Sequence, residues 1–350
     1  DPRLWDDPRW PAAVRNDRDG LHSAYARAVA MLTPSPVPPD YPRLPKLDAL
    51  ERSAKALGME SRFYRPPVTV TFTTGPNAAG VHQERCTGCG DCNSGCNHEA
   101  KNSTHMNYLP DAVAHGARIF TGAAVHSVVH DTATQKWMVR YQIVDLGREI
   151  YGAPDLFVLA DHVILSAGTI GSTAILLRSK EAGLSVSPQL GHHFTGNGDV
   201  LAFAFNTDTE INGVGLGTHK PGDMSPVGPT ICGIIDHRDT PNVKDGFVIE
   251  EGSLAAPIGG MMMGVLGLTS AVAGVRAPDL PGEGALDSEA RILESVLRGP
   301  YRGAMRNTQT YLVMAHDDES GEISIEDGRP RISWPNAGKQ AIYATVEKSL

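Results

Sequence analysis

The stretch from residue 155 to 183 is the feature that most restricts the fold of this 350-residue chain. It reads "DLFVLADHVILSAGTIGSTAILLRSKEAG", an apolar β-rich run that passes through Ala167 and Gly168 directly into an amphipathic helix. A buried strand, a glycine turn and a helix N-terminus present backbone N–H groups to a nucleotide, although many βα turns bind no ligand. Two further β-rich runs, 117–131 and 136–145, precede it and predict a β-meander.

Other segments predict a mixed fold with many loops and turns. Helices are expected over 20–32, 47–58, 103–115 and 339–350, and strands over 68–75, 200–206, 230–236 and 246–250. Residues 321–334 have the pattern of a β-hairpin with Asp327 and Gly328 as its turn. The expected fold class is therefore α+β or α/β: a partial Rossmann-like domain with a β-meander, followed by a mixed α+β domain.

Charge and cysteine content indicate which class of partner the protein binds and which cellular compartment it occupies. The formal net charge of −9 argues against a nucleic-acid partner, which would need a basic face. The five cysteines do not have the pattern of a secreted disulfide framework, and no signal peptide is visible, so a reducing compartment, the cytoplasm, is expected. Residues 252–275 carry no charge and are interpreted as a buried helix with its preceding loop. An apolar surface that touches a membrane is the alternative.

Five segments, in a fixed order, resemble a known enzyme family. They read "CTGCGDCNSGCNHEAKNSTHMNYLPDAVAHGARI", "VILSAGTIGSTAILLRS", "FTGNGDVLAFAF", "FVIEEG" and "GRPRISWP". Together they resemble the glucose–methanol–choline (GMC) oxidoreductases, and within them the bacterial branch similar to cholesterol oxidases, over roughly residues 1–334. The resemblance implies a Rossmann-like domain that binds FAD and an alcohol or sterol substrate oxidised by hydride transfer to the flavin.

The resemblance also implies the residues on the cofactor side. Val125 corresponds to the strand whose backbone holds the adenine, and Ala167 and Gly168 to the turn near the ADP ribose. Asn197 and Gly198 correspond to the segment that approaches the flavin and the substrate cavity. These five positions are the predicted FAD contacts.

Two adjacent glutamates are the predicted catalytic residues. In "FVIEEG" an acidic residue resembles the glutamate that faces the substrate in the cholesterol-oxidising branch. The spacing from Ile249 favours Glu251 over Glu250, and a shift of one position would exchange them. A carboxylate beside an apolar cavity has its neutral form favoured by desolvation, so it can accept a proton near neutral pH. The alternative is that two glutamates at the end of a strand are simply solvated.

The chain departs from the family pattern at two places. It has no G-x-G-x-x-G motif, which would cradle the pyrophosphate, and no His-Pro dipeptide, which begins the segment handling the hydroxyl proton. These departures predict an internal fragment with three parts: a cap segment over 1–100, a partial FAD-binding domain over 101–190 and a truncated substrate domain over 191–350. Expressed alone, such a fragment is expected to be poorly soluble, to bind FAD weakly and to oxidise no alcohol.

A cysteine-rich loop, 83–98, leaves the electron acceptor open. Cys86, Cys89, Cys92 and Cys96 have the C-x2-C-x2-C-x3-C spacing of a ferredoxin loop, but no second run exists and Asn97 replaces the usual proline. One hypothesis is an iron–sulfur cluster in a flavodehydrogenase that passes electrons to a carrier. The other is a glycine-rich loop covering the flavin of an enzyme that uses oxygen or a carrier. A catalytically inactive binding module is the third alternative.

Overall fold

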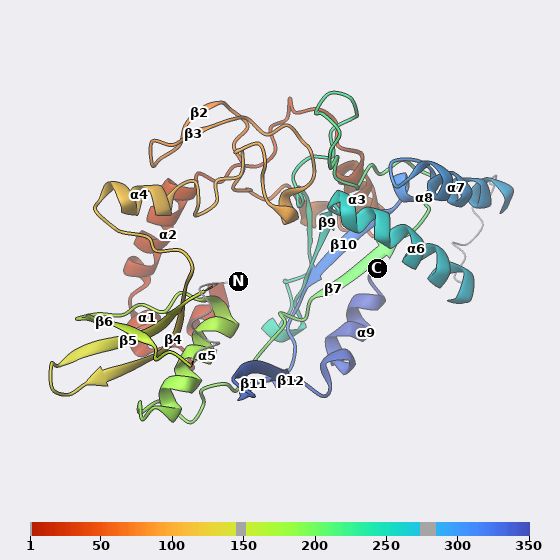
Figure 1. Ribbon diagram of the computed structural model, residues 1–350. Helices are drawn as coiled ribbons and strands as arrows, with labels where there is room; N and C mark the ends of the chain where they lie inside the picture. Colours follow the sequence, from red (N-terminus) through yellow and green to blue (C-terminus); the bar gives the residue numbers. More distant parts are fainter. Residues whose placement is uncertain (1, 145–151, 274–284) are drawn as a thin grey trace. The chain divides into compact units, whose positions relative to one another are not determined.

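The computed structural model describes residues 2–144, 152–273 and 285–350, and these form two compact units (Figure 1). The first unit comprises Asp1–Gly116, Asp199–His316 and Thr345–Leu350, and the second comprises Ala117–Gly198 and Asp317–Ala344. Both units mix helices with strands, which confirms the expected mixed fold class. The predicted three-part division by role stays a prediction.

The helices and strands are as follows. The helices are α1 (Ala12–Asn16), α2 (Arg18–Leu32), α3 (Pro45–Ala56), α4 (Tyr108–Ala114), α5 (Gly168–Glu181), α6 (Ala256–Ala273), α7 (Ala285–Arg298), α8 (Gly303–Arg306) and α9 (Ala341–Glu347). The strands are β1 (Phe63–Tyr64), β2 (Gly75–Pro76), β3 (His82–Gln83), β4 (Ala123–Asp131), β5 (Lys136–Ile143), β6 (Leu156–Ala160), β7 (Val200–Ala204), β8 (Ile234–Asp236), β9 (Val248–Gly252), β10 (Gln309–Met314), β11 (Glu322–Glu326) and β12 (Arg329–Ser333).

A five-stranded sheet forms the centre of the first unit. Its order is β1-β8-β9-β10-β7, and each neighbouring pair is antiparallel. Helix α3 covers one face of this sheet: Leu47 and the neighbouring Leu44 form a buried apolar cluster with Cys232, and Phe63 of β1 packs against it. Gly233 permits this close approach, because a Cβ atom there would lie 2.6 Å from Leu47 and 3.0 Å from Phe63.

Local sequence explains why α3 forms where it does. Pro45 occupies the first turn, where its missing N–H is not needed, and Asp48 and Lys55 complement the helix dipole at the two ends. Gly58 follows with φ of +68°, a left-handed conformation that glycine adopts without strain. The helix predicted over 47–58 is therefore confirmed.

The second unit contains the predicted β-meander. Strands β4, β5 and β6 pair in sequence order and antiparallel, and α5 lies against β4 (Figure 1). The backbone N–H of Val128 donates to Ser179 Oγ at 2.8 Å, which ties this strand to the helix. The predicted hairpin is also present as β11–β12, and Asp327 and Gly328 both have positive φ, as a type I′ turn requires.

Two predicted strands are shorter than expected. In the 68–75 segment, Val68 and Val70 make only isolated bridges, to Ser35 and Lys101, because each meets a different partner and no ladder can extend. The run ending at Ala167 is a strand only as far as Ala160. The side chain of Ile164 beyond it is 89% exposed. Prediction of a regular strand was therefore wrong for both 68–74 and 162–166.

The uncharged segment near residue 260 forms helix α6, which is apolar on two sides. Met262, Met263 and Leu266 pack against the buried Val214–Leu254–Met305 cluster, whereas Ile258, Met261, Val265 and Leu268 are exposed. The interpretation as a wholly buried helix was wrong for this second face. Among the residues that the structure describes, no helix is long and apolar enough to cross a membrane.

Candidate active site

The two predicted catalytic glutamates lie side by side on β9 and point to opposite faces of the five-stranded sheet. Successive side chains of a strand alternate between its faces. Glu251 lies on the face covered by α3, where it meets Lys46 of that helix. Glu250 therefore belongs to the other face, so the two carboxylates have separate surroundings.

Glu250 is the middle member of a row of side chains that crosses the whole sheet. Strand register aligns Tyr64 with Ile234, Ile234 with Glu250, Glu250 with Leu312 and Leu312 with Leu201. Directly paired residues share a face, so these five side chains lie together. Ile234 and Glu250 are buried, whereas Tyr64 is 38% and Leu201 is 56% exposed at the two ends. The face around Glu250 is therefore mostly apolar and is open at its margins.

The carboxyl group of Glu250 is prepared to exchange a proton near neutral pH. Its residue is 6% exposed, and its Oε2 atom is buried without a hydrogen-bond partner among the described residues. Burial, with smaller contributions from the charges of Asp199 and Glu251, raises the pKa of Glu250 to about 7. A buried acceptor without a donor is costly unless it is protonated or meets a ligand.

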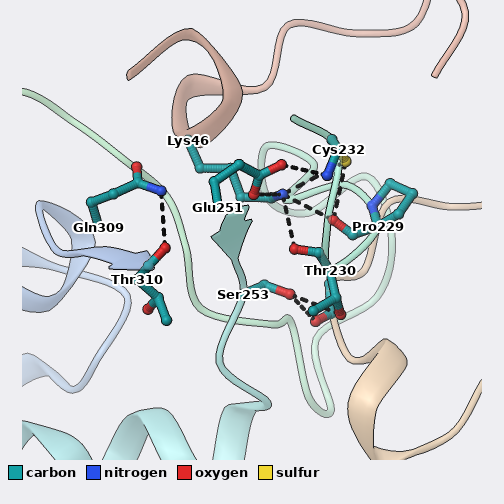
Figure 2. Close-up of polar contacts among 9 residues, drawn as sticks. Lys46, Pro229, Thr230, Cys232, Glu251, Ser253, Gln309 and Thr310 are labelled. Atoms are coloured by element: carbon teal, nitrogen blue, oxygen red, sulfur yellow. Dashed lines mark hydrogen bonds and ion pairs between the residues drawn. The ribbon is translucent and has the colours of Figure 1, made fainter. Parts of the chain in front are cut away.

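Glu251 is closed off by its own contacts (Figure 2). Its carboxylate forms an ion pair with Lys46, and both side chains are 0% exposed. Its Oε1 atom also accepts the backbone N–H of Cys232 at 2.6 Å. Burial raises the pKa of Glu251, and the opposing contacts with Lys46 and Cys232 favour its ionised form. Both of its oxygens are thus engaged inside the protein.

The cysteine loop is held in place by backbone and carboxylate contacts within the first unit. The carbonyl of Gly88 accepts from Val227 N and Gly228 N at 2.8 and 3.0 Å, and the carbonyl of Gly90 accepts from Ser253 Oγ at 2.7 Å. A Cβ atom on Gly90 would lie 2.5 Å from the Val227 side chain, so only glycine fits there.

Asp91 anchors the same loop to α6. Its carboxylate accepts the N–H of Gly217 at 2.8 Å and the N–H of Ala256, the first residue of α6, at 3.0 Å. These contacts fix the loop through its backbone and Asp91, without involving any thiol. Gly88 and Gly90 of the motif therefore have a packing role.

The four cysteines of the loop line one small pocket but do not form a metal site. Cys86, Cys89, Cys92 and Cys96 are partly exposed and outside any disulfide. Across residues 2–144, 152–273 and 285–350, no group of three or more His, Cys, Asp or Glu side chains is arranged to hold a metal ion. The iron–sulfur hypothesis is therefore not supported. The geometry favours the alternative of a packed glycine-rich loop.

Three of the predicted FAD contacts lie at neighbouring elements of the second unit. Val125 is on β4, and Ala167 and Gly168 form the junction that starts α5. Gly168 has φ of +71°, and a Cβ atom there would meet no atom within 4 Å. Ala167, the N-cap residue of α5, makes no side-chain cap to the first turn within the described part of the chain, and its own N–H donates to Ser172 Oγ at 3.0 Å.

The other two predicted contacts belong to a loop organised by a buried carboxylate. Asn197 and Gly198 both have positive φ, of 58° and 56°. Oδ2 of Asp317 accepts Thr195 Oγ1 at 2.8 Å, Gly196 N at 2.9 Å and Gly198 N at 3.0 Å. Burial alone would raise the pKa of Asp317, but these hydrogen bonds and one from Glu319 N lower it overall.

Lys46 and Asp317 escaped prediction from the sequence. Lys46 lies four residues before Leu50 and eight before Ala54, on the stripe of α3 that is buried. A lysine within an apolar stripe is a usable signal for a buried ion pair. Asp317 carried no such signal, since it precedes two further acidic residues in a polar segment and its partners lie about 120 positions away.

Comparison with known proteins finds a family match for part of the chain. Residues 45–195 match the family model described as GMC oxidoreductase, so this segment is similar to that family. Two Mycobacterium tuberculosis proteins, from strains H37Rv and CDC 1551 and each named an uncharacterized GMC-type oxidoreductase, are 39% identical over 108 residues. A cholesterol oxidase from Acinetobacter baumannii is 26% identical in a match of 238 aligned positions, and the match covers 61% of this chain.

The chain spans only part of the length of those relatives. It covers 15% of the length of each mycobacterial protein and 41% of the length of the cholesterol oxidase. The match over 45–195 includes the cysteine loop, the β-meander and all of α5. The five-stranded sheet around Glu250 lies largely outside it.

Proposed function

We propose that this chain belongs to an FAD-dependent oxidoreductase that acts on the CH–OH group of an alcohol or sterol, with Glu250 as the proton acceptor. The observation that carries the proposal is the buried Oε2 atom of Glu250, which lacks a hydrogen-bond partner among the described residues. A substrate hydroxyl placed against this atom would supply the missing donor. The carboxylate would then remove the hydroxyl proton as the C–H bond breaks.

The pKa of Glu250 suits that role. Because burial raises it to about 7, the carboxyl group is partly ionised at neutral pH and can both take up and release a proton. Glu251 is less suited, since Lys46 and Cys232 N–H already engage its carboxylate in a fully buried position. The structure thus favours Glu250 over the residue that spacing favoured.

The side chains around Glu250 favour an apolar substrate. Its row on the sheet is completed by Tyr64, Ile234, Leu312 and Leu201, and Met314 on the same face of β10 is 39% exposed. An apolar surface binds hydrocarbon by removing both from water. A sterol or a long-chain alcohol fits such a surface better than a sugar, which would need many polar partners.

The second unit has features that fit FAD. The uncapped N-terminus of α5, with Gly168 opening space before it, is suited to the polar adenosine end of the cofactor. Val125 on β4 and the Asn197–Gly198 segment are the other proposed contacts. FAD, when bound, supplies the acceptor for the hydride.

The direct test is anaerobic reduction of the flavin in the FAD-loaded full-length protein. Sterols, long-chain primary alcohols and sugars are added in turn, and the loss of flavin absorbance is followed. We expect reduction by an apolar alcohol and none by sugars. Bound FAD that no alcohol reduces would instead favour the inactive binding module. Reduction by alcohols that is unchanged in Glu250→Gln would refute Glu250 as the acceptor.

A further inference from the structure

Lys46 is buried completely, although it carries a charge that water would stabilise. Its Nζ atom forms an ion pair with Glu251 and donates to the carbonyl of Pro229 at 2.9 Å (Figure 2). It also lies 3.7 Å from Cys232 Sγ. A buried lysine persists when an anion and further acceptors surround it, and these contacts provide both.

The pair joins three segments that are distant in the sequence. Lys46 comes from α3, Glu251 from β9, and Cys232 from the segment that leads into β8. Glu251 Oε1 accepts the N–H of Cys232, and the thiol of Cys232 donates to Pro229 O at 3.2 Å. Burial raises the pKa of that thiol to about 12, so Cys232 contributes no charge. The ion pair thus holds β9 from the face that α3 covers, which is the face behind Glu250, and the pair has no net charge.

A different set of charged and titratable groups lies near Glu250, on the face of the sheet opposite α3. Asp199, just before β7, and Tyr64 of β1 both interact electrostatically with Glu250. Asp236, at the end of β8, pairs with Arg238 through bonds of 2.6 and 2.9 Å. Glu251 itself acts on Glu250 from behind, and Lys46 is the cation that balances Glu251.

We propose that Lys46 and Glu251 are positioning residues, which hold β9 in place and balance the charge behind Glu250. This inference rests on the proposed role of Glu250 as proton acceptor. At a separation of about 10 Å and an effective dielectric constant of about 20, an unbalanced charge shifts a carboxyl pKa by roughly one pKa unit. A shift of that size would move the pKa of Glu250 away from neutral pH, where a proton acceptor works best.

The variants have distinguishable consequences. In Glu251→Gln the negative charge behind Glu250 is gone, so the midpoint of the Glu250 titration should fall by roughly one pKa unit. In Lys46→Met the buried carboxylate has lost its counter-ion, so Glu251 itself should titrate at a higher pH than before. The double variant Lys46→Met/Glu251→Gln contains no buried charge, so it should regain the thermal stability that Lys46→Met loses.

The experiment is carbon-13 NMR titration of the full-length protein labelled at the side-chain carboxyl carbon of glutamate. The Glu250 signal is assigned by its disappearance in Glu250→Gln. We expect the Glu250 midpoint that falls in Glu251→Gln to return towards the parent value in the double variant, because no unbalanced charge then remains behind Glu250. A purely structural pair would change stability and leave the Glu250 midpoint unchanged in Glu251→Gln. An unchanged Glu250 midpoint in Glu251→Gln, or a lowered midpoint that persists in the double variant, would overturn the proposal.

The readout also separates this inference from the proposed function. The titration requires neither flavin nor alcohol turnover. If the Glu250 midpoint responds but Glu250→Gln oxidises alcohol normally, the pair acts on Glu250 and the catalytic role fails. If Glu250→Gln abolishes turnover but the midpoint does not respond, the catalytic role stands and the pair is only structural.

Discussion

Glu250 and Glu251 are neighbours on β9, yet one carboxylate is closed by Lys46 and the other has an oxygen with no partner among the described residues. Glu251 lies on the face of the sheet that α3 covers, whereas Glu250 lies on the opposite face, which is partly open. Two chemically identical groups thereby acquire different surroundings.

Replacing the proposed proton acceptor should lower turnover without removing the cofactor. We expect Glu250→Gln to reduce kcat by about 10²-fold or more, the size typical of a general base, with FAD binding unchanged. Glu326→Gln, an exposed site on the β11–β12 hairpin, is the matched control and should leave kcat unchanged. Steady-state kinetics with saturating alcohol measures both. A large loss in Glu251→Gln with none in Glu250→Gln would return the assignment to Glu251.

The pH dependence of the reaction should report the pKa of Glu250. A general base works only when ionised, so kcat/KM should fall tenfold per pH unit below a midpoint of about 7. Above the midpoint it should level off. In Glu250→Gln the residual kcat/KM should no longer fall as pH is lowered below 7. A limb centred near pH 4.5, the usual value for glutamate, would show that the carboxyl group is not desolvated during catalysis.

The same pKa predicts how stability depends on pH. The folded pKa of Glu250, about 7, lies above its usual value of 4.5, so protonation stabilises the folded state and this benefit is lost as pH rises through 7. Glutamine imitates the neutral acid. Relative to the parent, Glu250→Gln should therefore gain on the order of 2 kcal/mol between pH 5 and pH 8. Urea unfolding at the two pH values measures the gain, and an equal difference at both would contradict it.

Asp317 should stabilise the loop that contains Asn197 and Gly198. Its carboxylate oxygen accepts three hydrogen bonds, so Asp317→Asn should cost about 2 kcal/mol at pH 7. The pKa of Asp317 is lowered on folding, so this contribution is present above its usual value of 3.8 and is lost as pH falls below it. Urea unfolding at pH 7 and at lower pH follows the difference. A gap that persists in acid would mean that shape, not charge, matters.

The thiol of Cys86 in the cysteine loop should react slowly with alkylating agents. Burial raises the pKa of Cys86 to about 11, although the N–H of Gly88 and the hydroxyl of Tyr41 both donate to its sulfur. At pH 8, alkylation of Cys86 by iodoacetamide should be about 10²-fold slower in the folded protein than in urea. Mass spectrometry of the Cys86 peptide gives both rates. Equal rates, or stoichiometric iron with acid-labile sulfide in anaerobic protein, would contradict the packed-loop interpretation.

Local patterns were sufficient to predict the elements but not their assembly. The helix at α3, the strand at β9 and the β11–β12 turn followed from periodicity, capping residues and the Asp327–Gly328 pair. Alternation along a strand also implies that Glu250 and Glu251 face opposite ways. Which face is covered depends on where α3 packs, and Lys46 meets Glu251 across 205 positions. A single sequence contains no local signal for that pairing.

The partners of Asp91 bear on how this region is inherited. One carboxylate links the cysteine loop to Gly217 and to the first residue of α6, and a Cβ atom on Gly215 would lie 2.3 Å from that carboxylate. Aspartate at 91 and glycine at 215 are consequently tied together across more than a hundred positions. Among homologues, the two should be kept or lost jointly, whatever happens to the thiols. A loop transplanted without its glycine partner would meet a steric clash, so recombination between relatives should exchange the loop and the 215–217 turn as one inherited unit.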